Sequence, residues 1–193
     1  MCANLRLGAH VCTPHDCVRC GEPADAAGVH GLSCRHGDGR VTRHALVNQV
    51  LVEGFRAAAI PTRREPTHLT LQDGKRPDGV TLIPYSNGKA LIWDATIWST
   101  LSGSQMAATA RKSGAAAERA AAEKLRKYAT FALDYTVMPL AFETHGPLAA
   151  DTTKFLSELA LKIARERRCK RAGTFFQQRL CMAAVQRRGN AIA

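Results

Sequence analysis

Residues 73–97 read DGKRPDGVTLIPYSNGKALIWDATI, and this stretch decides the fold. Two runs enriched in Val, Ile, Leu, Thr and Trp, residues 78–83 and 90–98, are separated by PYSNGK, in which Asn87-Gly88 is a strong β-hairpin turn signal. A similar run, HLTLQ at residues 68–72, precedes them. We therefore predict three consecutive strands, the last two of which are antiparallel neighbours.

A helical pattern precedes the strands. Residues 43–60, RHALVNQVLVEGFRAAAI, have apolar positions at helical spacing, and Pro61 marks the end of the segment. The apolar positions of this helix are Leu46, Val47, Val50, Leu51 and Phe55.

Helices and one more strand follow. Residues 114–132 are alanine-rich and carry a Glu123–Lys127 pair at favourable spacing, which predicts a long helix. The run YTVMPLAFE at 135–143 predicts a strand, and helices are predicted over 152–171 and 175–188. The helix over 152–171 is expected to bury Phe155, Leu156, Leu159, Leu161 and Ile163. This order of elements predicts an α/β (α+β) fold with a mixed sheet flanked by helices.

Two aspartates fall on the hairpin strands. Asp78 opens the first strand and Asp94 lies within the second, so antiparallel pairing can bring both side chains to one point. Like charges held close together repel unless a divalent cation neutralises them, and Mg2+ accepts one or two carboxylates together with waters and phosphate oxygens. In the alternative interpretation, Asp78 starts a turn and Asp94 caps a segment or pairs with a surface arginine.

A Cys/His cluster lies near the N-terminus. Cys17, Cys20, His30 and Cys34 form a C-x2-C-x9-H-x3-C arrangement, whose ligand types are those of a closed, structural Zn2+ site. Residues 12–40 lack a hydrophobic pattern, so metal binding would supply their folding free energy. Free surface thiols are the alternative, and Cys12, His15 or His36 could replace one of the four ligands.

Charge and composition indicate the class of partner. The chain has 193 residues and a net charge of +11, and residues 152–193 carry ten Lys or Arg against Glu158 and Glu166. Such a basic surface is typical of proteins that bind nucleic acid, although a solvated helix face is the alternative. No apolar run approaches the ~20 residues of a membrane span, and the N-terminus does not resemble a secretory signal, so we expect a reducing, intracellular compartment and no membrane partner.

Several motifs occur together in one order: CVRC with His30 and Cys34, GRVTRHALVNQ, REP, DGKRPDG, LIWDATI, AEKLRKY, AFETHG and QRLCMAAVQRRGNA. This arrangement resembles the C-terminal restriction-enzyme-like endonuclease region of non-LTR retrotransposon proteins, over nearly the whole chain. The resemblance implies a zinc knuckle in residues 1–40, a PD-(D/E)xK nuclease core in 41–150 and a basic helical extension in 151–193. It also implies that Asp78 and Asp94 hold Mg2+ and that the knuckle assists DNA binding.

The catalytic lysine departs from the simple pattern. Position 96 is Thr96, where many such nucleases have lysine, so the resemblance points to Lys124 or Lys127 in AEKLRKY. Lys124 shares a helix face with Tyr128 at i, i+4. Further candidates at the edge of the site are His44, Glu65 and Arg76.

The resemblance implies a nuclear metal-dependent endonuclease that nicks double-stranded target DNA. The nick would leave a 3′ hydroxyl for reverse transcription of the element RNA by the polymerase domain of the parent polyprotein. Two other functions stay open: a nucleic-acid-binding fragment of a truncated element without catalysis, and a zinc-stabilised protein-interaction domain. The target sequence and the oligomeric state do not follow from these patterns.

Overall fold

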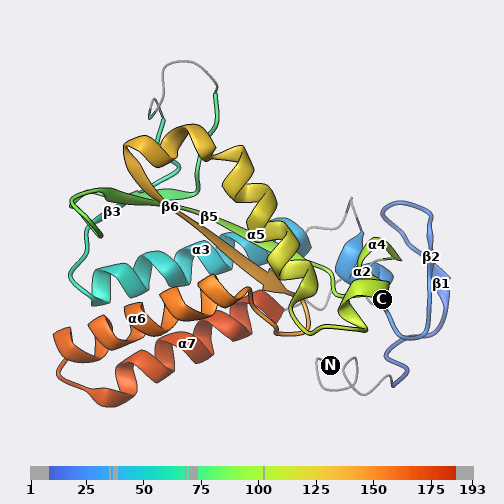
Figure 1. The fold of residues 1–193 in the computed structure, drawn as a ribbon. Helices are drawn as coiled ribbons and strands as arrows, with labels where there is room; N and C mark the ends of the chain where they lie inside the picture. The colour runs from blue at the N-terminus through green and yellow to red at the C-terminus, as the bar shows by residue number, and fades with distance from the viewer. Residues whose placement is uncertain are drawn as a thin grey trace.

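A computed structural model of the chain describes residues 9–34, 36, 39–67, 69, 74–101 and 103–185 (Figure 1). It is a mixed α/β fold in which helices pack on both faces of a four-stranded sheet. The main helices are α3 (Gly39–Ala57), α4 (Gly103–Thr109), α5 (Ala115–Lys127), the 3-10 helix η1 (Ala129–Leu133), α6 (Ala150–Glu166) and α7 (Lys170–Val185). The strands of this sheet are β3 (Thr62–Arg64), β4 (Gly79–Thr81), β5 (Ala90–Trp98) and β6 (Tyr135–Glu143).

The sheet has the order β3-β4-β5-β6. The pairs β3–β4 and β4–β5 are antiparallel, whereas β5 and β6 run parallel and are joined by the crossover through α4 and α5. The prediction of a mixed sheet flanked by helices is therefore confirmed. The antiparallel hairpin of β4 and β5 places Gly79 opposite Trp93.

Alternation along β5 divides the core between the two faces of the sheet. Leu91, Trp93 and Ala95 pack into the main core together with α3, α6 and α7. Ile92 points to the other face, where it packs with Tyr128 and the 3-10 helix. Asp94 has the same parity as Ile92, so its side chain belongs to the face that α5 covers.

Close helix packing on the α3 face depends on small residues. A Cβ atom at Gly54 of α3 would lie 2.3 Å from the ring of Phe176 on α7. A Cβ at Gly173 would lie 2.3 Å from the carbonyl oxygen of Ala160 on α6. These glycines let α3, α6 and α7 approach closely enough to bury the main core.

Some predicted bounds need correction. Leu161 is 59% exposed, because it lies two residues after the buried Leu159 and therefore on the opposite side of α6. The long helix over 114–132 ends at Lys127 and continues as η1, and α4 is an additional helix. Most of HLTLQ (68–72) lies outside the described residues, and β3 at Thr62–Arg64 is a strand that the sequence analysis did not identify.

The N-terminal segment forms a small separate sheet. Strands β1 (His15–Asp16) and β2 (Pro23–Ala24) pair antiparallel, and the short helix α2 (His30–Ser33) follows. Helix α2 contacts α3, so the segment adjoins the core at the start of α3. Within the described residues, no helix is both long and apolar enough to cross a membrane.

Candidate functional site

Asp94 lies in the middle of β5 and is held by residues of α5. Its side chain is only 8% exposed. Lys124 Nζ donates to Asp94 Oδ1 at 2.8 Å, and the Tyr128 hydroxyl donates to Asp94 Oδ2 at 2.5 Å. Lys127 Nζ lies 3.7 Å from the same Oδ2 and donates to the Tyr128 hydroxyl oxygen at 3.0 Å. Both predicted lysines are thus brought to this carboxylate.

Asp78 immediately precedes β4 and is held by α3. Its backbone N–H donates to the carbonyl oxygen of Trp93 at 2.9 Å, which fixes Asp78 beside β5. Its Oδ2 accepts hydrogen bonds from Asn48 Nδ2 at 3.1 Å and from the backbone N–H of Ala95 at 2.7 Å. The same oxygen lies 2.9 Å from Nε2 of His44, a pair whose side chains are 42% and 16% exposed for His44 and Asp78.

The His44–Asp78 pair is electrostatically matched. The hydrogen bond to Asp78 outweighs burial and raises the pKa of His44 above its ordinary value. Burial disfavours the charged form of Asp78, but the hydrogen bonds from His44, Ala95 and Asn48 outweigh it and lower the pKa of that carboxyl. Asp78 is therefore ionised at neutral pH.

The two carboxylates are neighbours on the sheet but contact different helices. Asp78 is bound by the backbone N–H of Ala95, the residue after Asp94, yet its side-chain partners belong to α3. Among the described residues, no third His, Cys, Asp or Glu joins both aspartates in a group whose ligand atoms all lie within 4.8 Å. The pair can thus offer a cation at most two carboxylates, with water or a ligand completing its coordination.

The side chains of Glu65 and Arg76 form an ion pair with each other and make no hydrogen bond to either aspartate. Both are about half exposed. Their backbones nevertheless border the site, since the N–H of Glu65 donates to the carbonyl oxygen of Asp78 at 2.8 Å and the carbonyl oxygen of Arg76 lies 3.0 Å from the Tyr128 hydroxyl. They act here as supports of the strand that carries Asp78.

A buried carboxylate anchors α5. Glu143 at the end of β6 is 1% exposed, and its Oε1 accepts the backbone N–H groups of Ala116 at 3.0 Å and Ala117 at 3.3 Å. These N–H groups belong to the first turn of α5, where a helix presents unsatisfied donors and a partial positive charge. The contact fixes the position of the helix that carries Lys124 and Tyr128.

A cleft of about 430 Å³ opens beside the carboxylates. Its lining combines four cationic or titratable side chains with the end of β5: Arg40, Val41, Arg43, His44, Ala95, Thr96, Ile97 and Lys124. The cationic lining suits an anionic ligand such as a phosphate.

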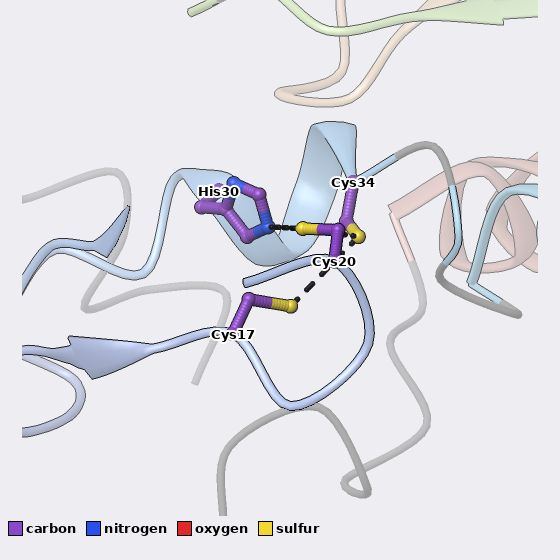
Figure 2. A group of neighbouring side chains, drawn as sticks. All are labelled: Cys17, Cys20, His30 and Cys34. Carbon is purple, nitrogen blue, oxygen red and sulfur yellow. Dashed lines mark hydrogen bonds between the residues drawn. The ribbon is translucent and has the colours of Figure 1, made fainter. Parts of the chain in front are cut away.

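Cys17, Cys20, His30 and Cys34 form the second site (Figure 2). Their ligand atoms all lie within 4.8 Å of one another, with Sγ of Cys34 3.6 Å from Cys20 and 3.9 Å from Cys17. Two thiolates on one tetrahedral Zn2+ stand about 3.8 Å apart, given Zn–S bonds of about 2.3 Å. This cluster could hold a metal ion such as zinc.

The local chain explains how the four ligands meet. Cys17 and Cys20 flank a tight turn, closed by the N–H of Gly21 donating to the carbonyl of Cys17 at 2.7 Å, and His30 begins α2. Hydrogen bonds from the backbone of Arg19 and Cys20 lower the pKa of Cys17 to about 6, which favours the thiolate form that a metal ligand needs.

The alternative ligands point elsewhere. The Cys12 thiol donates to the carbonyl of Asp25 at 3.2 Å, His15 Nδ1 lies 2.8 Å from the carbonyl of Thr13, and His36 is exposed. None of the three belongs to the cluster.

Sequence reasoning missed Asn48 and Trp93. Asn48 is 1% exposed and bridges Trp93 to Asp78, with Trp93 Nε1 donating to Asn48 Oδ1 at 3.0 Å. Asn48 could have been identified from the sequence because it is a polar residue on the apolar face of α3, one turn after His44, and a buried polar group needs a hydrogen-bond partner. Tyr128 was noted for sharing a face with Lys124, but its bond to Asp94 was not expected.

Compared with known proteins, the chain matches no family model, and no curated protein matches it.

Proposed function

We propose that this protein is a Mg2+-dependent DNA endonuclease with a PD-(D/E)xK core, of the kind found in non-LTR retrotransposon proteins. The observation that carries the proposal is the Lys124–Asp94 contact at 2.8 Å, formed next to Asp78. The order of sequence motifs pointed to these same residues, although Lys124 and Asp94 are 30 positions apart in the chain. A divalent cation held by carboxylates can polarise a phosphodiester and activate water, and an adjacent lysine can stabilise the charge that develops on the phosphate.

The donor set suits a hard divalent cation. Asp78 and Asp94 lie next to an open cleft, and a cation would reach Asp94 once Lys124 moves away from it. Mg2+ is commonly bound by one or two carboxylates with waters and phosphate oxygens completing the shell. When bound, the ion would polarise the scissile phosphate and lower the pKa of an attacking water. Mg2+ and the roles that follow are part of the proposal.

Side chains around the cleft would bind the phosphate, position the Asp94 carboxylate and bind the DNA backbone. Lys124 lines the cleft and contacts Asp94, so it can hold a phosphate oxygen or orient the attacking water. Tyr128 and Lys127 keep the Asp94 carboxylate in place through the hydroxyl bond and the nearby ammonium charge. Arg40, an exposed residue of the cleft lining, would bind the DNA backbone without reading its sequence.

The zinc site has a structural role in this proposal. A four-ligand Cys/His set leaves no open position for chemistry, so Zn2+ would stabilise the N-terminal segment. Because α2 contacts α3, the knuckle adjoins the helix that supplies Arg40, Arg43 and His44. It would thereby extend the nucleic-acid surface beyond the cleft, with double-stranded DNA as partner and element RNA as a second ligand.

Within a parent retrotransposon protein, the reaction would be a nick that leaves a 3′ hydroxyl for a polymerase domain. This role implies a nuclear location and a reducing environment in which the cysteines stay available for zinc. Both statements rest on the resemblance of the motifs.

Plasmid nicking tests the proposal. The zinc-loaded chain is incubated with supercoiled DNA in Mg2+ or EDTA, beside Asp78→Ala, Asp94→Ala and the control Asp134→Ala, which removes an exposed aspartate. We expect Mg2+-dependent nicking by the parent and the control, with loss of nicking but not of DNA binding in the other two. Nicking that persists in both site variants would exclude this site.

One observation favours a second candidate, a nucleic-acid-binding protein without catalysis. Both oxygens of Asp94 are occupied by Lys124 and Tyr128, and Asp94 is 6% exposed, so the carboxylate is closed to a cation unless a side chain moves. For such a protein the same assay would give DNA binding without cleavage by any variant.

A further inference from the structure

Asn48 connects the hydrophobic core to the candidate site. It lies on α3, is 1% exposed, and its side-chain amide bonds in two directions. Oδ1 accepts from the indole N–H of Trp93 at 3.0 Å, and Nδ2 donates to Oδ2 of Asp78 at 3.1 Å. A buried amide that satisfies both a core aromatic ring and a functional carboxylate constrains each of them.

The orientation of this amide follows from its partners. The indole nitrogen of Trp93 can only donate, so Asn48 must present its oxygen to Trp93 and its NH2 group to Asp78. The reverse orientation would place two donors together and set an amide oxygen against a carboxylate. Trp93 is itself fully buried and packs against Phe55 with ring centroids 4.9 Å apart, so the core surrounds its ring.

This arrangement determines which oxygen of Asp78 is available. Oδ2 receives Asn48, the N–H of Ala95 and His44 within 3.1 Å, which fills its capacity as an acceptor. None of the described residues donates a hydrogen bond to Oδ1. The two oxygens of one carboxylate therefore have different roles.

We infer that Asn48, locked by Trp93, is a positioning residue that ties down Oδ2 of Asp78 and so leaves Oδ1 as the ligand atom for a divalent cation. The inference rests on the proposed function in that it takes Asp78 as a metal ligand. It adds a residue of α3 and a core tryptophan to the site, and it requires Asp78 to bind the cation through one oxygen. Partners of ligating carboxylates commonly set metal affinity in this way.

Asn48→Ala removes the donor. The alanine has no N–H for Asp78, and it adds no charge beside the carboxylate. Gln49→Ala is the matched control, since it removes an amide one residue further along α3 on the exposed face. Trp93→Phe is the second variant, because it keeps an aromatic ring in the core but removes the N–H that orients the amide.

The test is direct binding of Mn2+ to the zinc-loaded full chain, followed by electron paramagnetic resonance of the free ion, with Asp78→Ala defining the site. We expect Asn48→Ala to weaken the Asp78-dependent binding by about tenfold or more, the range for such supporting residues, while Gln49→Ala binds as the parent does. Trp93→Phe should weaken it in the same direction, and it decides the matter if Asn48→Ala does not fold. Thermal melting and zinc content of each variant establish that the fold is retained.

Binding separates this inference from the proposed reaction. If the parent binds Mn2+ through Asp78 but does not nick DNA, the proposed endonuclease activity fails while the role of Asn48 is still measured. Unchanged Mn2+ affinity in folded Asn48→Ala or Trp93→Phe, or a parent without Asp78-dependent binding, would overturn the inference.

Discussion

Replacing Gly79 by alanine should disturb the fold and the candidate site together. Gly79 lies opposite Trp93 in the β4–β5 pair, and a Cβ atom there would be 2.1 Å from Cζ2 of the Trp93 ring. Carbon atoms in contact stand about 3.5–4 Å apart, so the ring would have to move by roughly 1.4 Å or more. Such a shift is enough to break the 3.0 Å bond from Trp93 to Asn48.

The magnitude combines two costs. Overpacking a core costs about 1–3 kcal/mol, and leaving a buried donor unsatisfied costs about 1–3 kcal/mol more. For a domain of this size, each kcal/mol lowers the melting temperature by about 2–4 °C, so Gly79→Ala should melt about 10 °C below the parent.

Thermal unfolding followed by circular dichroism measures this difference. The control is Gly88→Ala: no atom lies within 4 Å of a Cβ there, so the only cost is left-handed strain at φ 73°, about 1–2 kcal/mol. Melting of Gly79→Ala within about 2 °C of the parent, or above Gly88→Ala, would refute the packing argument, since an increment of 1 kcal/mol already shifts the midpoint by that much.

Three further predictions concern separate contacts. Cys34→Ser should abolish stoichiometric zinc measured by metal analysis of the purified chain, whereas Cys169→Ser, which changes an exposed thiol, should retain it; zinc retention by Cys34→Ser would remove this cysteine from the ligand set. Tyr128→Phe takes one donor from the buried Asp94 carboxylate and should lower the free energy of unfolding in denaturant by about 1–3 kcal/mol. Stability equal to that of the parent would contradict a role for the Tyr128–Asp94 hydrogen bond. The ion pair with Arg179 lowers the pKa of Glu53 below its ordinary value of 4.5. The pair contributes under about 1 kcal/mol to the free energy of unfolding at this partly exposed site. This contribution is present above pH 4.5 and is lost as the pH falls through the lowered pKa. The free energies of unfolding of Glu53→Gln and the parent should therefore differ at pH 7 and converge as the pH falls through the lowered pKa, and a constant difference would count against the pair.

The sheet was accessible from sequence because its central strands carry local signals. The runs at 90–98 and 135–143 coincide with β5 and β6, whose apolar and β-branched residues are buried on both faces. The strand at Thr62–Arg64 was missed because its residues are largely polar and exposed at the edge of the sheet. Such a strand is defined by its hydrogen bonds to β4, and sequence periodicity does not report these.

The residues of the candidate site could be predicted from the sequence, but their partners could not, because these also depend on tertiary contacts. Two aspartates on a hairpin and lysines one helix later are visible as residue types, but the partners of each depend on which helix covers which face. The assignment of Asp78 to α3 follows from tertiary packing that no local pattern encodes. The sequence feature that indicated this packing is the pair of polar residues His44 and Asn48, which lie one helical turn apart among apolar residues.

The two aspartates contact different helices, and this arrangement affects how their negative charges are offset. Asp78 is offset by His44 of α3, and Asp94 by Lys124 of α5, on the opposite face of the sheet. Each carboxylate thus has a cationic or titratable side chain of its own helix within hydrogen-bond distance, so the chain does not need a metal to offset the repulsion between the two aspartates. The direct contacts are divided in the same way, because Asp78 bonds side chains of α3 and Asp94 bonds side chains of α5. A cation binding between them would have to compete with Lys124 but could reach Asp78 through Oδ1 without breaking a contact among the described residues.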